Sequence, residues 1–361
     1  MTTPSVTVAM SDLNSELGFG STATVQINNP GIRAMASNFT QQSQIDFLSL
    51  RSKSFPYVMI ILNAKINFLR SFNNGKNWEL CSPAPPLSFI YGCTSPFNYW
   101  ASDSSLNIWN STDGKTWVQK ATAVGELLNY VNGYLVAVNG ATIKYSTDGI
   151  TWTTGSTIKT SLGNNVLHIK CIDCVTLGGV QYWVAGGLGN DASGEMLWFY
   201  QGSGAPTGTF TPTASQPGGE VWSLTAAFGN VVFASSVGWI YWYDSALAWH
   251  SYNLANAYDK MSFVSLANGR LYATTAGNSS SFVHKYTTDL VTFTDAGLPT
   301  NMGFIQVKYK NSTYVASCYG QGYSTGSWPA VAYSTNGTSW TNSAESFDYS
   351  YLTDPYSGLL T

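Results

Sequence analysis

Residues with the donor atoms of a soft-metal site follow one another at one place in the chain. His168, Cys171 and Cys174 are spaced three residues apart in the segment V-L-H-I-K-C-I-D-C-V. Imidazole nitrogens and thiolates are the ligands that Zn²⁺ prefers in proteins. However, this segment predicts a strand, in which residues three apart face opposite sides. Because no second ligand pair follows at a suitable spacing, and because five cysteines are an odd number that favours free thiols, we predict a buried strand and no metal site.

Carboxylates that could support hydrolysis occur singly. Cleavage of a glycosidic bond generally takes two carboxyl groups that face each other across the substrate. The candidates outside any repeated motif are Glu126, Glu195, Glu220, Asp259 and Asp295. Their spacing pairs no two of them. We therefore predict no catalytic residues, no cofactor, and a role other than that of an enzyme.

The composition excludes several classes of protein. Only 10% of the 361 residues are charged, against about 25% in an average globular protein. Sixteen basic and 19 acidic residues give a net charge of −3, so the chain lacks the basic character of a nucleic-acid-binding protein. The longest apolar run, 57–62, is far shorter than the roughly 20 residues that span a membrane. The first residues lack the basic and apolar regions of a secretory signal, so we expect synthesis in a cytoplasm.

A seven-residue motif recurs along most of the chain. Its copies are F-N-N-G-K-N-W at 72–78, S-T-D-G-K-T-W at 111–117, S-T-D-G-I-T-W at 146–152, a G-T-F ending at Phe210, Y-D-S-A-L-A-W at 243–249, T-T-D-L-V-T-F at 287–293 and S-T-N-G-T-S-W at 334–340. The aromatic residues that end these copies lie 35 to 58 residues apart, about 44 on average. This period fits four short strands with their turns, which is the size of one propeller blade.

Within each period the pattern is that of strands joined by tight hairpins. Asn132-Gly133 and Asn268-Gly269 each precede a β-rich run, and Asn-Gly pairs tolerate the positive φ angles of two-residue hairpin turns. We predict an all-β, seven-bladed β-propeller over residues 55–361, preceded by a separate segment at 1–54. The stretch 186–208 is expected to be an inserted surface loop. Residues 346–361 are expected to supply a strand that completes the first blade.

The repeated motif resembles the Asp-box of sialidase-like and related β-propellers. In that family the box is a structural turn between the two outer strands of a blade. The resemblance implies this role for Asn74, Gly75, Trp78, Asp113, Gly114, Trp117, Asp148, Gly149, Trp152, Asp289, Phe293, Asn336, Gly337 and Trp340. A sialidase would hold the carboxylate of its substrate with three arginines, whereas the repeat region contains only Arg70 and Arg270. The sequence therefore argues against that activity.

Residues 1–54 carry a different signature. M-S-D-L-N-S-E-L-G at 10–18 is followed by S-T-A-T-V-Q-I-N-N at 21–29, I-R-A-M-A at 32–36 and F-L-S-L-R-S-K-S at 47–54. This succession resembles a leader of tail and tail-fibre proteins of tailed bacteriophages, and it implies attachment to other virion proteins. The residues that match the leader are Asp12, Glu16, Leu17, Gly18, Arg33, Arg51 and Lys53. Residues 10–17 also predict a short helix ended by a glycine, and an arm that closes the propeller is the alternative role.

Aromatic residues outside the motif are candidates for sugar recognition, which uses stacking and hydrogen bonds. The candidates are Trp239, Trp242, Tyr319, Tyr323 and Trp328, and packing between blades is their alternative role. Together these features predict a structural protein of a bacteriophage virion, present in symmetric copies in a tail or tail fibre, whose propeller recognises a host-surface glycan. The alternatives are a passive decoration or adaptor protein that binds only other virion proteins, and a glycan depolymerase.

Overall fold

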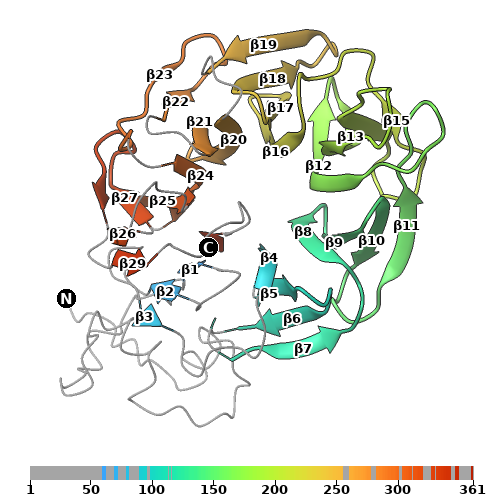
Figure 1. Ribbon diagram of the computed structural model, residues 1–361, viewed down its shortest axis with the longest axis horizontal. Coiled ribbons are helices and arrows are strands. Elements are labelled where there is room, and N and C mark those ends of the chain that lie inside the picture. The colour runs from blue at the N-terminus through green and yellow to red at the C-terminus, as the bar shows by residue number, and fades with distance from the viewer. Residues whose placement is uncertain are drawn as a thin grey trace, which may run out of the picture.

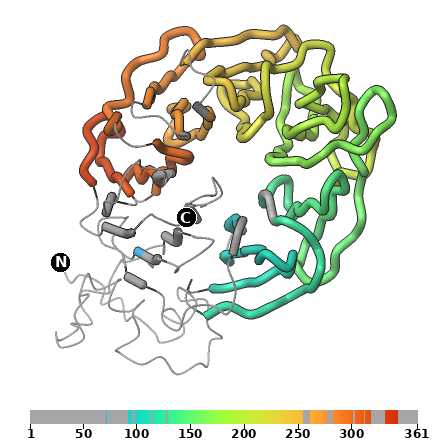
Figure 2. The backbone as a smooth tube through the Cα atoms, viewed as in Figure 1, coloured from blue at the N-terminus to red at the C-terminus, as the bar shows by residue number. Residues whose placement is uncertain are grey.

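The computed structural model describes most of the chain from residue 98 onward (Figure 2). The described residues are 98–254 apart from 113 and 115, 260–277, 282–300, 303–319 apart from 311, and 331–342, with strand segments at 59–61, 69–71, 79–80, 89–95, 327–329, 346–348 and 359–360. This part of the chain consists of strands, turns and loops, and it holds no helix that could cross a membrane. The helix predicted at 10–17 lies outside it, as does all of 1–54.

Six four-stranded antiparallel sheets, here called blades 1 to 6, stand around a common axis (Figure 1). Blade 1 contains β4 (Phe89–Ser95), β5 (Asn98–Asp103), β6 (Ile108–Ser111) and β7 (Val118–Ala121), and blade 2 contains β8 (Glu126–Val131), β9 (Tyr134–Asn139), β10 (Thr142–Ser146) and β11 (Thr153–Thr157). Blade 3 contains β12 (His168–Leu177), β13 (Val180–Leu188), β14 (Leu197–Gln201) and β15 (Thr211–Pro212), and blade 4 contains β16 (Val221–Ala227), β17 (Asn230–Ser235), β18 (Trp239–Tyr243) and β19 (Trp249–Asn253). Blade 5 contains β20 (Lys260–Ala267), β21 (Arg270–Gly277), β22 (His284–Thr287) and β23 (Thr294–Asp295), and blade 6 contains β24 (Gly303–Lys310), β25 (Thr313–Tyr319), β27 (Val331–Ser334) and β28 (Thr341–Asn342).

The first strand of each blade is innermost, because neighbouring first strands contact one another around the axis. Since the strands of a blade alternate in direction, the connections between them fall at two opposite ends of the blade. The hairpin between strands one and two and the turn between strands three and four lie at one end, here called the hairpin face. The connection between strands two and three and the crossing to the next blade lie at the other end, here called the loop face. The described residues thus form an all-β propeller, as predicted, with six such blades where the sequence predicts seven.

A further four-stranded sheet, here called the closing sheet, joins the two ends of the described chain. Its order is β3 (Glu79–Leu80), β2 (Leu69–Ser71), β1 (Met59–Ile61) and β30 (Leu359–Leu360). β30 pairs antiparallel with β1, which confirms the expectation that the C-terminal region completes this sheet. A separate two-stranded sheet pairs β26 (Ser327–Pro329) with β29 (Ser346–Asp348).

Two-residue hairpins with positive φ angles connect strands one and two of blades 2 to 5. Asn132 and Gly133 have φ angles of 52° and 81°, and Asn268 and Gly269 have 49° and 71°. These values confirm the prediction for both Asn-Gly pairs, since this turn needs left-handed backbone at both positions. Blade 4 uses Phe228 at the first of the two positions, with a φ of 52°.

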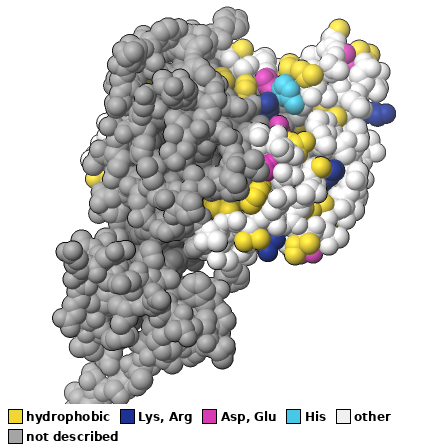
Figure 3. Space-filling view, turned by 60° about the horizontal axis from the view of Figure 1, so that its bottom comes forward, with side chains coloured by type: hydrophobic (Ala, Val, Ile, Leu, Met, Phe, Trp, Pro, Cys, Tyr) yellow, Lys and Arg dark blue, Asp and Glu magenta, His cyan; other side chains and the backbone are white. Residues whose placement is uncertain are grey.

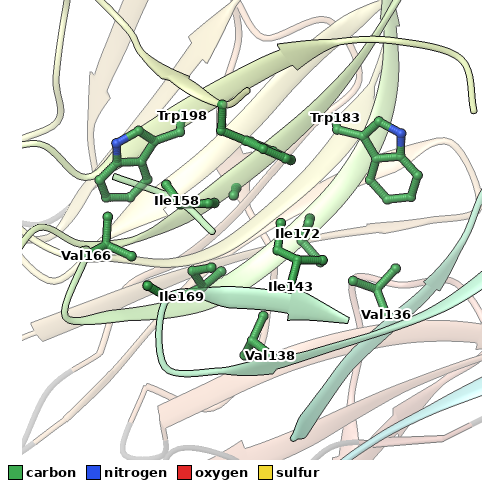
Figure 4. Close-up of a cluster of buried hydrophobic side chains, with 12 residues drawn as sticks. Val136, Val138, Ile143, Ile158, Val166, Ile169, Ile172, Trp183 and Trp198 are labelled. Atoms are coloured by element: carbon green, nitrogen blue, oxygen red, sulfur yellow. The ribbon is translucent and has the colours of Figure 1, made fainter. Parts of the chain in front are cut away.

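The cores lie between blades. In the interface of blades 2 and 3, Val136, Ile143, Ile169, Trp183 and Trp198 are fully buried (Figure 4). Corresponding clusters join blades 1 and 2, 3 and 4, 4 and 5, and 5 and 6. Because each sheet buries both faces, its strands show runs of buried residues in place of simple alternation.

The stretch 186–208 is not one inserted loop. It contains the end of β13, a loop at 189–196, all of β14 and part of the turn before Phe210. The prediction was wrong because it relied on the glycine and serine content of the whole stretch. That content did not reveal the short apolar strand β14, whose Leu197 and Trp198 are fully buried.

Candidate functional site

The repeated motif forms a turn between strands three and four of a blade. In the copy at 146–152, the Asp148 carboxylate accepts hydrogen bonds of 2.8 Å from the backbone N–H of Ile150 and of Thr151. The Ser146 hydroxyl accepts one of 2.8 Å from the Gly149 N–H. The Trp152 indole N–H donates to the Gly149 carbonyl at 3.1 Å. The polar side chains of the motif thus form hydrogen bonds with backbone groups of their own turn.

Other copies repeat this geometry with different side chains. Asn336 accepts from the backbone N–H of Thr338 and Ser339 at 3.0 and 2.8 Å. Asp289 accepts from those of Val291 and Thr292, both at 2.9 Å. In the copy at 111–117, Gly114 N–H donates to Ser111 and the Trp117 indole donates to the Gly114 carbonyl, while Asp113 lies outside the described residues.

The turns also join neighbouring blades, which the sequence did not reveal. Trp152, Phe210, Trp249, Phe293 and Trp340 each pack against the hydrophobic cluster that their blade shares with the preceding one. The repeat therefore encodes contacts between blades as well as a hairpin within each blade.

The glycine of the turn fits against a large ring of the preceding blade. A Cβ on Gly149 would lie 2.1 Å from the Trp100 ring of β5, and one on Gly337 would lie 2.4 Å from the Tyr272 hydroxyl of β21. The copy at 287–293 has Leu290 instead, with a φ of 62°, and this side chain is buried in the cluster between blades 4 and 5. Val232 of the preceding blade belongs to the same cluster, and as the third residue of β17 it takes the place that Trp100 has on β5.

The degenerate copy at 243–249 is a different turn. The Asp244 carboxylate accepts from the backbone N–H of Ala246 and Ala248, and Leu247 has a φ of 60°. A turn after Asp103, between β5 and β6, has the same bonds to Ser105 and Asn107. A shared Asp-Ser-x-Leu sequence is the signal that could have separated this turn from the repeated motif.

The predicted aromatic candidates are not brought together. Trp239 and Trp242 lie on β18 but belong to opposite faces of blade 4, and they pack against the clusters shared with blades 3 and 5 respectively. Tyr319 and Trp328 lie in β25 and β26, but nothing is described of their side chains, and Tyr323 lies outside the described residues.

Other predicted residues lie outside the described part of the chain. They are Asp12, Glu16, Leu17, Gly18, Arg33, Arg51, Lys53, Asn74, Gly75 and Trp78.

The segment 168–177 forms the predicted strand, β12. His168 pairs with Glu220, whereas Cys171 and Cys174 pack against the clusters on opposite faces of blade 3. Burial raises the pKa of both thiols, that of Cys174 to about 11. Within the described residues, no three His, Cys, Asp or Glu side chains gather as a metal site requires.

Carboxylates on the loop face hold loops together. Asp191 accepts hydrogen bonds from the Thr160 hydroxyl at 2.5 Å and the Asn164 amide at 2.9 Å, and Glu195 accepts one from the Ser161 N–H at 2.9 Å. These bonds fasten the crossing between blades 2 and 3 to the loop between β13 and β14. Asp191 and Glu195 therefore have a structural role.

Polar side chains also link the first strands around the axis. The Asn129 amide donates to the Ile172 carbonyl at 3.1 Å, and the Ser223 and Ser265 hydroxyls accept from the N–H of Val264 and Val307 at 2.8 and 2.9 Å. The inner edges of these strands would otherwise leave backbone groups without a partner. Side chains thus replace the missing neighbouring strand.

Three ionisable groups lie on first strands around the axis. Lys308 of β24 interacts electrostatically with Asp173 of β12 and with Cys93 of β4. These strands belong to blades 6, 3 and 1, no two of which are neighbours in chain order, so the groups can approach one another only near the axis. Burial raises the pKa of Asp173 to about 6 and lowers that of Lys308. No pattern in the sequence marked these residues, because their separation exceeds 75 positions in every pair.

Comparisons with known proteins agree with this architecture. No family model matches the chain, and no curated protein matches its sequence. A structure of YCF48 from Cyanidioschyzon merolae is 14% identical, with a TM-score of 0.52, covering 71% of this chain and 87% of that one. A structure of YCF48 bound to D1 peptide is 10% identical, with a TM-score of 0.52 and coverages of 72% and 85%. A streptogramin B lyase structure is 11% identical, with a TM-score of 0.53 and coverages of 81% and 88%. At such identities the likeness shows the fold alone, and the protein is a β-propeller.

Proposed function

We propose that this protein is a bacteriophage virion component, in a tail or tail fibre, whose propeller binds a glycan of the host surface. The observation that carries the proposal is the order of the chain, a tail-protein-like leader at 1–54 followed by a β-propeller. A propeller presents many short loops on a rigid ring, an arrangement that suits binding. The leader would attach the ring to other virion proteins.

The polar surface is compatible with sugar recognition. Most of the described surface visible in Figure 3 is uncharged, in keeping with the 10% of charged residues in the chain. Carboxylates such as Asp148, Asp191 and Asp289 are held by hydrogen bonds within turns and loops. This engagement favours binding over hydrolysis, and we keep a glycan depolymerase as a minor alternative.

We also propose that the repeat turns are degenerate Asp-boxes and that the closing sheet is a seventh blade. The motif at 72–78 falls between β2 and β3, the two strands of that sheet farthest from β30. This is the position that the repeat turns occupy in the blades.

A passive adaptor that binds only virion proteins is the second candidate. One neighbour in fold, YCF48, has been solved bound to D1 peptide, so a ring of this general shape can hold a peptide. Exposed apolar residues at the hairpin face, among them Ile150 and Val291, would suit a protein partner.

Binding to intact bacterial cells tests the proposal. Labelled full-length protein should bind cells of a host strain saturably, and soluble surface polysaccharide from that strain should compete. A full-length variant with reversed charges at Asp12, Glu16, Arg51 and Lys53 should still bind cells but should no longer join other tail proteins. Association with virion proteins without cell binding would favour the adaptor, and release of sugar into the supernatant would favour the depolymerase.

A further inference from the structure

Exposed apolar side chains gather at the hairpin face of the ring. Among the described residues, six large ones lie in or beside the hairpins and turns of that face, namely Val118, Ile150, Phe228, Leu247, Leu266 and Val291. The two others, Leu162 and Leu167, both lie in the crossing between β11 and β12 on the loop face. Phe228, Leu247, Leu266 and Val291 belong to the neighbouring blades 4 and 5 and are here called the blade 4–5 patch. Apolar surface that is concentrated on one face is typical of a site of contact with another molecule.

Phe228 holds an exposed ring in a strained backbone. It is the first residue of the hairpin between β16 and β17, where its φ is 52° and the residue is 39% exposed. Blades 2 and 5 have Asn132 and Asn268 at this place, and asparagine adopts left-handed backbone far more readily than a bulky residue does. The Asn230 amide fixes the hairpin by donating to the carbonyls of Ala227 and Phe228 at 3.3 and 2.8 Å. Because other blades form this turn without a large ring, we take the strain as a sign of contact outside the ring.

Carboxylates border the blade 4–5 patch. Asp244 and Asp289 lie in the two outer turns that contribute to it. The hydrogen bond with His250 and those from backbone N–H groups lower the pKa of Asp244, and bonds from backbone N–H groups of its own turn lower that of Asp289. Both carboxyls are therefore ionised at neutral pH. Arg270 of blade 5 is turned towards blade 6, where it donates to the Asn336 carbonyl at 2.7 Å. A complementary partner surface is thus apolar and has basic side chains beside the apolar ones.

The strand that follows the leader begins at this same face. β30 contacts β4, the innermost strand of blade 1, so it takes the place of a first strand in the closing sheet. β1 pairs antiparallel with β30, with Ile60 opposite Leu360, and so takes the place of a second strand. In blades 1 to 6 every second strand begins at the hairpin face. The chain therefore passes from the leader at 1–54 into the ring, at Met59, on the side of the blade 4–5 patch.

We infer that the blade 4–5 patch binds a tail protein of the virion, one that presents an apolar surface with basic side chains beside it. The inference rests on the proposed function, in which the leader attaches the ring to other virion proteins. A leader that joins the ring at the hairpin face brings this face close to the attached partner, so the second contact forms at a high effective concentration. Two contacts fix the orientation of the ring, and its loop face then points away from the particle, towards the host.

The test uses the purified full-length protein and, as the probe, particles of the same phage assembled without it. The triple variant Phe228→Asn, Leu247→Asn and Val291→Thr replaces exposed apolar side chains with polar ones that suit the backbone of their turns. Asn tolerates the positive φ of the first two positions, and Thr338 holds the place of Val291 in the turn of blade 6. Association with the particles, measured by cosedimentation, should weaken at least about tenfold, whereas the melting temperature should stay the same or rise. A lower melting temperature with unchanged association would show that these side chains serve the ring, and it would overturn the inference.

Matched substitutions on the loop face provide the control. Leu162→Asn with Leu167→Thr makes the same kind of change at residues that are 64% and 49% exposed. This double variant should associate with the particles as the unaltered protein does. An equal weakening by the loop-face variant would mean that exposed apolar residues act without regard to the face, which contradicts the inference.

A photo-reactive benzophenone amino acid identifies the partner directly and does not depend on weakened binding. It replaces Val291 in one variant and Leu162 in another, and both proteins are irradiated on the particles. A cross-link from position 291 to a tail protein, with none from position 162, supports the inference. Cross-links from position 291 to a second copy of this chain, or to its own residues 1–58, would show a different occupant and refute it.

Two further comparisons separate the inference from the proposed function. The triple variant should bind host cells as well as the unaltered protein does, because its loop face is intact, and a loss of cell binding would show that the patch meets the host instead. Full association of the triple variant with particles overturns the patch as a contact while the proposed function stands. Failure of the unaltered protein to associate with the particles counts against the proposed function, and the inference falls with it.

Discussion

Two aspartates show how the repeat turns at the hairpin face, here called the rim, differ from the first strands around the axis of the ring. Asp148 lies exposed in a repeat turn, and hydrogen bonds from the N–H of Ile150 and Thr151 lower its pKa. Asp173 lies at the axis, where burial raises its pKa to about 6. Backbone N–H groups bond to both carboxylates, but the exposed Asp148 is stabilised as a charge by the turn that it organises, whereas desolvation outweighs these bonds at Asp173. The comparison teaches that backbone hydrogen bonds lower the pKa of a carboxyl in an exposed turn, whereas deep burial raises it despite the same kind of bond.

Opening the ring should have the largest effect, because the axis exists only while the ring is closed. Deleting 359–361 removes β30 and leaves the inner edge of β1 unpaired. We expect a loss of about 3–5 kcal/mol in the free energy of unfolding, measured by urea denaturation. The variant Leu360→Pro, which keeps the length but removes a backbone donor, should lose a smaller part. Equal stability of the shortened and full chains would show that β30 does not close the ring.

A methyl group at the rim should be the next most damaging change. Gly149→Ala places a Cβ against the Trp100 ring at a position with a φ of 72°, and we expect a cost of about 3 kcal/mol from overpacking and backbone strain together. The matched control is Gly133→Ala, at a φ of 81° with no atom within 4 Å, which should cost only about 1 kcal/mol. Thermal or urea unfolding measures both. Equal losses would mean that the turn does not press on the preceding blade.

Acidic pH should stabilise the axis. The pKa of Asp173 in the folded protein, about 6, lies above the ordinary value of 3.8, so its contribution is fully present below pH 3.8 and is lost as pH rises through 6. Relative to Asp173→Asn, the unaltered protein should lose on the order of 1–2 kcal/mol between pH 4.5 and 7.5. Parallel stability curves for the two proteins across this range would contradict a desolvated carboxyl.

Losing the rim carboxylate should have the smallest effect. Asp148→Ala removes an acceptor from two backbone N–H groups that water can partly replace, so we expect a loss of about 1 kcal/mol. Asp148→Asn should cost less, because Asn336 accepts the same two bonds in the turn of blade 6. Since its pKa is lowered, the contribution of Asp148 is present above pH 3.8 and fades as pH falls through the folded value. A larger loss for Asn than for Ala would refute this account of the turn.

Much of the rim could be predicted from the sequence because its determinants are local. The side chains of Ser146 and Asp148 bond to groups within three residues, and Asn132-Gly133 adopts its turn from its own backbone preferences. Such short-range requirements leave a repeated pattern. The period of about 44 residues then follows from the four strands that each turn helps to join.

The degenerate copies mark the limit of that reasoning. Leu290 holds the left-handed conformation of the missing glycine, and its side chain is buried in the cluster shared with the preceding blade. The turn at 243–249 kept its place between strands three and four but changed its hydrogen bonds. The local sequence could not show how these two copies replace the missing glycine and the missing hydrogen bonds. In the first copy the replacement involves a cluster shared with another blade, and in the second it is a different type of turn.

By itself, the sequence determined the fold class, the position of the turns and the strand character of β12, since each depends on spacing within a few residues. Only the tertiary structure decided that Trp239 and Trp242 separate to opposite faces of one blade, and that Lys308 lies within electrostatic range of Asp173 and Cys93. The physical reason is ring closure. It brings together strands far apart in the chain, and the distance between their residues along the sequence carries no information about the distance across the axis.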